Sequence, residues 1–454
     1  MAATLIERRE RSVTIQIEIP LSRSLLETEE AIQAALNEAG VLATGAALEQ
    51  FDTDGGPLQF GSNRWTSKGQ EPKTYQTPYG EVVVSRHVYQ TCAGGVTFCP
   101  LERDARIILT ATPRFAKQVS HKYAEMSAGR VLDDLAGNHG RAVARSFVQD
   151  LADAVGSVAL AKEQDWHYTT PALDVPVQTI GVGLDGTCVL LVQDGQRQTM
   201  VGTVSLYDRD GERQHTIYVA ATPEYGKAQF LQRLQREIEQ AQQLYPQARL
   251  TAVADGAQDN WDFLGQFTRD QVVDFYHATG YLGKAAKAAC PRSFAGRQAW
   301  LDERCHRLKH EAGAAGRLLV EMAELPTDGL SEEVQSGLQE AVTYFRNHQH
   351  QMRYATRVLA KLPIGSGVTE AACKTIVKQR MCKSGSRWKE QGVGIVSRAI
   401  ALQLLGKPRS CAKYFTSQPA ALRLTFSDPG EASSRSSDTA RRFRKATFCA
   451  AVRS

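Results

Sequence analysis

The order of strand-like and helix-like segments between residues 177 and 275 constrains the fold of this 454-residue chain more than any other feature. Three apolar, β-branched runs come first with only short turns between them, which predicts three antiparallel strands. Two shorter apolar runs follow, each after a segment with helical spacing, which predicts parallel strands joined by helical crossovers. The expected strands are Val177–Val192, Gln198–Tyr207, Gln214–Ala220, Leu250–Ala254 and Val272–Phe275, with helices at Phe230–Ala241 and Asp259–Phe267.

The resulting order, βββαβαβ, is that of an RNase H-like fold, an α/β class built on one mixed sheet with acidic residues at strand ends. Residues 283–360 are almost entirely helical in pattern and interrupt this order, so we expect an all-α insertion there. A last helix is expected to begin near Gly367 and to run to about Met381. The sequence therefore predicts a catalytic core in two parts, residues 172–282 and 361–405.

The chain before this core predicts two modules. Residues 1–110 predict an N-terminal α+β module. Its features are an alternating stretch at Val13–Ile19, a helix from about Ser24 to Ala39 that ends at Gly40, and a strand-rich segment at 72–100. The segment that follows, as far as residue 165, changes to a helical pattern.

Residues 111–165 have the outline of a helix-turn-helix DNA-binding domain. The first helix would be anchored by Val131 and Leu135, and the second by Val143, Phe147, Val148 and Leu151, with a turn at Gly137–Gly140. Arg141 and Arg145 would then lie at the start and on the outer face of the second helix, where a recognition helix meets the major groove. The alternative interpretation is an ordinary helical hairpin that packs on its own domain.

Basic residues gather in two segments of a chain whose net charge is +5. Lys374–Lys389 holds six basic residues and no acid, and Thr439–Arg453 holds five and no acid, within an expected basic and partly disordered tail at 406–454. Such segments suit a polyanion such as DNA, although a solvated basic face is the alternative. The expected phosphate contacts are Lys374, Lys378, Arg380, Lys383 and Arg387. Trp388 could stack on an unpaired base or lie in the core.

The nine cysteines are scattered and include no CxxC pair, which is typical of reduced thiols in a cytosolic protein. His87, Cys92 and Cys99 are close in sequence, but a structural zinc site needs four ligands in a tighter pattern. The chain has no apolar run of 18 residues, and its N-terminus lacks the features of a secretory signal. A cytoplasmic, nucleoid-associated protein with no membrane segment is expected.

Three acids are distinguished by their surroundings. Asp185 lies in the first expected strand (IGVGLDGTCVLL), Asp255 ends the fourth (LTAVADGA), and Glu370 begins the last helix (GSGVTEAACK). Nearby glycines would leave room at each carboxylate: Gly181, Gly183, Gly186, Gly256, Gly365 and Gly367. Asp185 and Asp255 would converge at one edge of the sheet because their strands are neighbours. For each acid alone, an Asp-Gly turn or a solvated position is the simpler interpretation.

Three converging carboxylates suit phosphodiester chemistry. The reaction requires neutralisation of a charged transition state, activation of an oxygen nucleophile and stabilisation of the leaving oxygen. Two divalent ions roughly 3.5–4 Å apart meet all three needs, and hard oxygen ligands hold them. The sequence therefore predicts that Asp185, Asp255 and Glu370 bind two Mg²⁺ or Mn²⁺ ions.

The motifs LDGT, VADGA, DFYHA and GSGVTEAACK, with RWKEQG after them, resemble those of bacterial insertion-sequence transposases of the ISKra group. These are Asp-Asp-Glu transposases related to the Mutator-like class. The resemblance covers most of residues 40–405, and the stretch after Leu405 lies outside it. It implies the RNase H-like fold and puts the acidic triad on Asp185, Asp255 and Glu370. It also implies an auxiliary role for Asp274 and His277, which match a short acid-x-x-His motif of related transposases.

The function expected from the sequence is a metal-dependent DNA transposase that cleaves element ends and joins them to target DNA. Its partners would be double-stranded DNA, namely terminal inverted repeats and target, and further copies of the chain, at least as a dimer. Two alternatives remain open at this point. One is a metal-dependent nuclease that does not join strands, and the other is a DNA-binding protein that has lost catalysis.

Overall fold

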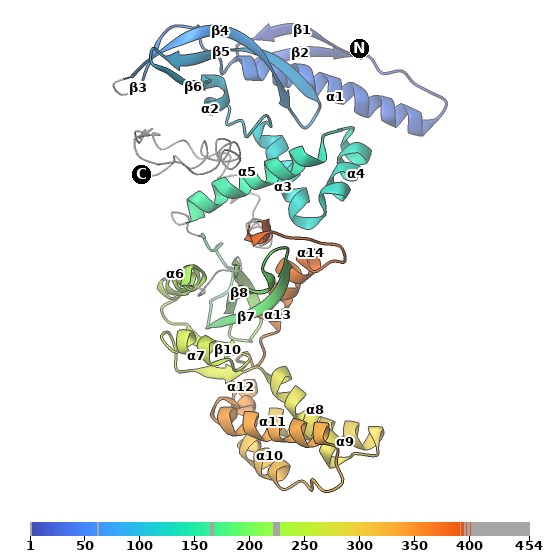
Figure 1. Cartoon of the computed structure of the whole chain (residues 1–454), viewed down its shortest axis with the longest axis vertical. Helices are drawn as coiled ribbons and strands as arrows, with labels where there is room; N and C mark the ends of the chain where they lie inside the picture. The colour runs from blue at the N-terminus through green and yellow to red at the C-terminus, as the bar shows by residue number, and fades with distance from the viewer. Residues whose placement is uncertain are drawn as a thin grey trace. The chain divides into compact units, whose positions relative to one another are not determined.

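A computed structural model of the chain describes residues 2–60, 63–163, 168–220 and 228–390, and in addition 392–394, 396 and 400 (Figure 1). The described residues fall into two compact units, one within Met1–Trp166 and one within His167–Leu405. Each unit is considered by itself. The basic tail expected at 406–454 lies outside the described residues.

The first unit begins with antiparallel strands and one long helix. A two-stranded sheet and a four-stranded sheet of order β3-β4-β5-β6 are both antiparallel. The elements are β1 (Ala3–Arg9), β2 (Ser12–Ile17), α1 (Leu25–Glu49), β3 (Leu58–Phe60), β4 (Asn63–Gln76), β5 (Glu81–Thr91), β6 (Gly94–Phe98) and α2 (Pro100–Asp104). Side chains of α1, β4, β5 and α2 form a shared core that includes Leu48, Tyr75, Val84 and Leu101.

Helix α1 continues ten residues past the end that the sequence predicted. The prediction was wrong because Gly40 is inside the helix and does not end it. A Cβ atom at Gly40 would lie 2.3 Å from the ring of Tyr79, and one at Gly45 would lie 3.0 Å from Val82. These glycines therefore allow close packing of the helix against the strand region.

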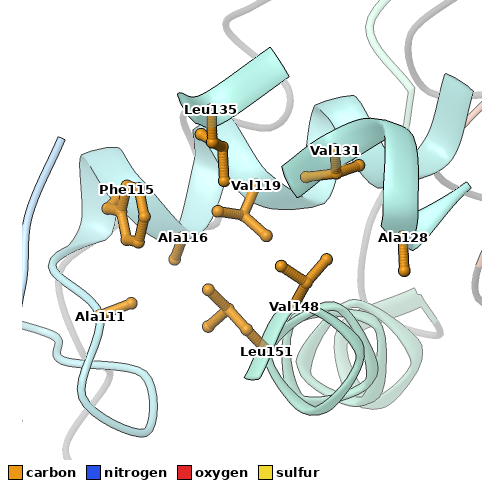
Figure 2. Packing of buried hydrophobic residues seen from close by; sticks show 9 residues of the cluster. All are labelled: Ala111, Phe115, Ala116, Val119, Ala128, Val131, Leu135, Val148 and Leu151. Carbon is orange, nitrogen blue, oxygen red and sulfur yellow. The ribbon is translucent and has the colours of Figure 1, made fainter. Parts of the chain in front are cut away.

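Three helices complete the first unit: α3 (Pro113–Glu125), α4 (Ala128–His139) and α5 (Arg145–Glu163). Gly140 ends α4 with a left-handed conformation, φ 60°. The expected anchors Val131, Leu135, Val148 and Leu151 are fully buried. Figure 2 shows Val148 and Leu151 of α5 directed toward the side chains of α3 and α4. The two predicted helices are present, and α3 completes their core. The turn predicted at Gly137–Gly140 was placed too early, because α4 continues through Gly137 to His139 and the turn lies between Gly140 and Arg145.

The second unit is built on a five-stranded mixed sheet of order β11-β10-β7-β8-β9. Strands β7, β8 and β9 are antiparallel in sequence order, whereas β10 is parallel to β7 and β11 is parallel to β10. The elements are β7 (Thr179–Leu191), β8 (Gly195–Tyr207), β9 (Arg213–Ala220), α6 (Ala228–Leu244), β10 (Arg249–Ala254), α7 (Gln258–Leu264) and β11 (Gln271–Val273). The predicted order of strands and helices is confirmed.

Helices cover both faces of this sheet, which explains why its strands are nearly continuous apolar runs. Gly183 pairs with Thr203, and the neighbouring pair on the opposite face is Leu184 with Gly202. A Cβ at Gly202 would lie 2.8 Å from Leu234 of α6. A Cβ at Gly183 would lie 2.3 Å from Thr369, in a helix that follows the insertion. Asp185 shares the face of Gly183, because side chains alternate along a strand.

The expected helical insertion is present between β11 and the last helix (Figure 1). Its elements are α8 (Phe275–Ala289), α9 (Phe294–His310), α10 (Ala314–Ala323), α11 (Glu332–His348), a 3₁₀ turn (Gln349–Gln351) and α12 (Tyr354–Leu359). The chain then forms α13 (Gly367–Ala372), a π-helical turn (Cys373–Lys378) and α14 (Gln379–Met381), close to the predicted bounds. No helix in the described ranges combines the length and apolar composition that a bilayer span requires.

The buried side chain of Arg357 fastens the end of the insertion to the sheet. Its guanidinium lies 2.7 Å from the carboxylate of Asp270, donates to Thr251 Oγ1 at 2.5 Å and donates to the Pro363 carbonyl at 3.0 Å. These contacts bring the chain back to the sheet just before α13. The position of the last helix therefore depends on the return of the insertion.

Candidate functional site

Asp185 and Asp255 lie on neighbouring parallel strands at the same level. Gly183 of β7 pairs with Val253 of β10, and each aspartate is two residues further along its strand direction. The backbone turns immediately after Asp255, where Gly256 has φ 109°. The two carboxylates therefore reach the same region at the carboxyl end of β10, as the sequence predicted from the strand order.

Glu370 reaches this region from α13, which packs on the same face of the sheet. The hydroxyls of Thr369 and Thr203 are 2.7 Å apart, and both residues are 2% exposed. Glu370 and both aspartates line one pocket. The other lining residues are Leu184, His277, Ser366, Gly367, Ala371, Cys373, Lys374, Lys378 and Gln379. The three acids predicted from the sequence thus meet in one place.

The acids repel one another in this pocket. Burial raises the pKa of Asp185 above its ordinary value, and the charges of Asp255 and Glu370 raise it further. The Gly186 N–H opposes this shift by donating to Asp185 Oδ1 at 2.6 Å. The thiol of Cys373 is 3.6 Å from Asp185 Oδ2, and its own pKa is raised by burial and by that carboxylate. A bound cation would relieve this crowding of negative charge.

The three carboxylates match a divalent cation in the kind of atom that they offer, since Mg²⁺ and Mn²⁺ prefer oxygen ligands. They do not form a coordination shell in this conformation. Within the part of the chain that the structure describes, no three His, Cys, Asp or Glu side chains are grouped closely enough to hold a metal ion. Hydrogen bonds within the protein occupy both oxygens of Asp185, from the Gly186 N–H and the Cys373 thiol, and one oxygen each of Asp255, from the Ala257 N–H, and Glu370, from the Ser366 hydroxyl. The carboxylates would have to rotate before the three acids could bind the same cation.

The acid-x-x-His motif lies beside the acids and has two distinct parts. Asp274 is fully buried and caps the N-terminus of α8, where its Oδ1 accepts the His277 N–H at 2.6 Å. Its Oδ2 accepts hydrogen bonds from the N–H and the hydroxyl of Ser366. The exposed His277 lines the pocket itself. Asp274 therefore holds residues next to the pocket through hydrogen bonds, whereas the His277 side chain lines the pocket.

Arg141 is not on an exposed helix face, so that part of the prediction was wrong. It precedes α5 and is only 5% exposed. Its guanidinium donates to the Thr77 carbonyl at 3.0 Å and to Gln76 Oε1 at 2.6 Å, and it lies over the ring of Phe115. Arg141 therefore joins the helices to the strand region of its own unit. Arg145 is exposed at the first residue of α5, as expected.

Two of the residues predicted to contact DNA near the C-terminal end of the core are buried. Trp388 is 7% exposed, and its Nε1 donates to the Met381 carbonyl at 3.1 Å. Arg380 is 6% exposed and lies over the Trp388 ring, so Arg380 is not presented to DNA as expected, whereas Trp388 lies in the core, which is one of the two alternatives that the sequence left open. The other four predicted contacts are exposed: Lys374, Lys378, Lys383 and Arg387. Of these, Lys374 and Lys378 line the pocket of the acids.

The glycines around Asp185 have a different role from the one that the sequence suggested. The space at Gly181 is taken by Tyr207, at Gly183 by Thr369 and at Gly186 by Gln198. These positions admit neighbouring protein atoms and leave no open room for a phosphate backbone. The predicted role of these three glycines was therefore wrong, although Asp185 itself lines the pocket.

The possible metal site at His87, Cys92 and Cys99 has no support in the structure. His87 Nδ1 lies 2.9 Å from the carboxylate of Asp52, and that carboxylate also accepts the His87 N–H. No grouping of metal-ligating side chains involves these residues in the described ranges. His87 is explained by this local hydrogen bonding.

Sequence reasoning missed four residues that contact the acids, one of which is Asn260, whose Nδ2 donates to Asp255 Oδ1 at 3.3 Å. Ser366 and Cys373 hydrogen bond to Glu370 and Asp185, and Tyr344 of the insertion donates to the Asp255 carbonyl at 2.9 Å. Ser366 could have been noticed because it lies four residues before Glu370, in the same motif. Tyr344 is 89 residues from Asp255, and no local pattern indicates that contact.

Neither the models of known protein families nor the curated proteins give a match to this chain. What the site can do therefore follows from its own residues.

Proposed function

We propose that this chain is a DNA transposase with an RNase H-like core, which cleaves the ends of a mobile element and joins them to target DNA. The observation that carries the proposal is the meeting of Asp185, Asp255 and Glu370 in one pocket. They come from two neighbouring strands and a helix, and 185 residues separate the first acid from the last (370 − 185). Convergence of such distant acids in an accessible pocket is typical of a catalytic centre.

The topology of the second unit supports the proposed fold. The strand order β11-β10-β7-β8-β9, with three antiparallel strands followed by two parallel ones, is the order expected for an RNase H-like sheet. The helical insertion lies between β11 and the helix that bears Glu370. This agrees with the resemblance to transposases that carry a helical insertion before the last acid.

The residues of the pocket suit a phosphodiester substrate. Lys374 and Lys378 project from the helical segment that bears Glu370 and supply positive charge for the phosphate backbone. Two divalent cations, when held by the three carboxylates, would supply charge neutralisation and activation of the attacking oxygen. The acids alone would repel a phosphate. His277 faces the same pocket and could donate to a phosphate oxygen or orient an acid.

The decisive experiment is cleavage of labelled DNA that carries the inverted repeats flanking the reading frame, with Mg²⁺ or Mn²⁺ and purified chain. We expect metal-dependent nicks at the repeat ends and strand-transfer products when target DNA is added. Asp185→Asn should abolish both products. Asp194→Asn, in the exposed turn of the same hairpin, is the matched control and should retain activity.

Each result has a defined meaning. If Asp185→Asn cleaves as well as the parent, the assignment of the catalytic site is wrong. Cleavage without joined products would favour the alternative of a metal-dependent nuclease that does not join strands. Binding to the repeats with no metal-dependent cleavage would leave a DNA-binding protein that has lost catalysis.

A further inference from the structure

Ser366 connects two carboxylates at the edge of the candidate site. Its Oγ is 2.9 Å from Asp274 Oδ2 and 3.0 Å from Glu370 Oε1. Ser366 itself is 8% exposed, so water does not readily replace either contact. The serine is the only residue with a described hydrogen bond to both acids.

The hydroxyl has one hydrogen and cannot donate to both carboxylates at once. When it donates to Asp274, its lone pairs face Glu370 Oε1 at hydrogen-bonding distance with no proton between them. When it donates to Glu370, that unfavourable contact disappears. The hydrogen therefore has two alternative positions, and each leaves one of the two carboxylates facing a lone pair of the hydroxyl.

Asp274 tolerates the loss of this hydrogen. Its carboxylate also accepts the His277 N–H and the Ser366 N–H, and it lies at the N-terminus of the 15-residue helix α8. Glu370 has no other described hydrogen-bond donor to its carboxylate. When the pocket holds no cation, donation of the hydroxyl to Glu370 is therefore more favourable than donation to Asp274.

We propose that Ser366 is a positioning residue through which Asp274 sets the orientation of Glu370 for cation binding. Without a cation, the hydroxyl donates to Glu370 and keeps its carboxylate beside the pocket. Once Glu370 directs its oxygens to a cation, the hydrogen turns to Asp274. The inference rests on the proposed function, since it assumes that Glu370 is a metal ligand.

The test measures Mn²⁺ binding by electron paramagnetic resonance on the full chain, with no DNA present. Removal of groups that orient metal ligands weakens affinity by about 10–100-fold in proteins, and Ser366→Ala is expected to weaken Mn²⁺ binding about tenfold. Ser366→Thr keeps the hydroxyl and should retain affinity near that of the parent. Ser384→Ala, an exposed serine beyond α14, is the control and should not change binding.

A double-mutant cycle separates positioning from general damage to the fold. In a Glu370→Gln background, Ser366→Ala should have no further effect on the residual Mn²⁺ binding. An unchanged affinity in Ser366→Ala, or a loss of equal size in the Glu370→Gln background, would overturn the inference. A parent chain that binds no Mn²⁺ would overturn it together with the two-metal site. A parent that binds Mn²⁺ but cleaves no DNA would overturn the proposed function alone.

Discussion

The hydroxyl oxygens of Thr203 and Thr369 lie 2.7 Å apart between the central sheet and the helix that bears Glu370. Thr369 immediately precedes Glu370, so this contact sets how far the glutamate lies from the strand that carries Asp185. Gly183 makes the contact possible, because a Cβ there would lie 2.3 Å from Thr369 Oγ1 and 3.2 Å from the Val253 carbonyl. The spacing of two candidate metal ligands thus depends on the absence of one side chain.

Gly183→Ala should therefore damage both stability and the site. The added methyl must displace α13 or the strand, and overpacking of this kind costs about 1–3 kcal/mol. We expect a lower urea midpoint and loss of metal-dependent cleavage. Gly280→Ala in α8 is the control, because a Cβ there meets nothing within 4 Å and should leave stability unchanged or slightly higher. Equal stability of Gly183→Ala and the parent would contradict the packing described here.

Arg357→Ala should destabilise the second unit. The side chain is 4% exposed and bonds to Asp270, Thr251 and Pro363. Asp270 would keep its ion pair with Arg249 at 2.8 Å, so the loss comes mainly from the buried contacts of Arg357 with Thr251 and Pro363 and should be about 1–3 kcal/mol. Chemical denaturation should detect this loss. The exposed Arg346, replaced by alanine, should change stability by less than about 0.5 kcal/mol.

The strands of the central sheet could be predicted within about three residues, because helices cover both sheet faces and leave continuous apolar runs in the sequence. The end of α1 could not be predicted. A glycine signals a helix end when only local conformation matters, but Gly40 faces Tyr79, which is distant in sequence. Tertiary packing reversed the local signal there.

The same distinction applies to the site. The convergence of the acids could be predicted from local pattern, because Asp185 lies within an apolar strand, Asp255 directly follows one, and Glu370 lies in the first turn of a helix. Arg141 could not, since its guanidinium bonds to a carbonyl 64 residues away and nothing near it indicates burial. Trp388 is buried because its backbone pairs with the end of β7, where Val192 N–H donates to its carbonyl at 3.0 Å. Such long-range pairing leaves no signal in the local sequence.

Stability should fall between pH 5 and pH 8 because of Glu237 in α6. This carboxyl is 5% exposed, and burial raises its pKa to about 7. Its Oε2 has no hydrogen-bond partner among the described residues. The folded state holds the proton more tightly than the unfolded state, so the stabilisation present below pH 4.5 is lost as the pH rises through 7. The contribution of Glu237 to the free energy of unfolding therefore differs by at most about 3 kcal/mol between low and high pH.

Glu237→Gln should remove this dependence and leave the chain more stable than the parent at pH 8. Thermal unfolding of parent and variant at pH 5 and pH 8 measures the effect, and the difference between them isolates Glu237 from other titrating groups. Glu239→Gln, an exposed neighbour on the same helix, should follow the parent at both pH values. A variant that loses stability with pH as the parent does would show that Glu237 is ionised in the folded chain.

Lys374→Ala and Lys378→Ala should each weaken DNA binding by a similar factor for all sequences. Both side chains are exposed and line the pocket of the acids. We expect them to contact phosphates, which are the same in every DNA sequence. Loss of one phosphate contact reduces the slope of log affinity against log salt by about 1. Fluorescence anisotropy on two unrelated duplexes from low to moderate salt would measure both quantities. Lys287→Ala, exposed on α8, is the matched control with an unchanged slope. A loss of affinity for only one duplex would indicate that the lysines read bases. An unchanged slope of log affinity against log salt in the lysine variants would show that these lysines do not contact DNA phosphates.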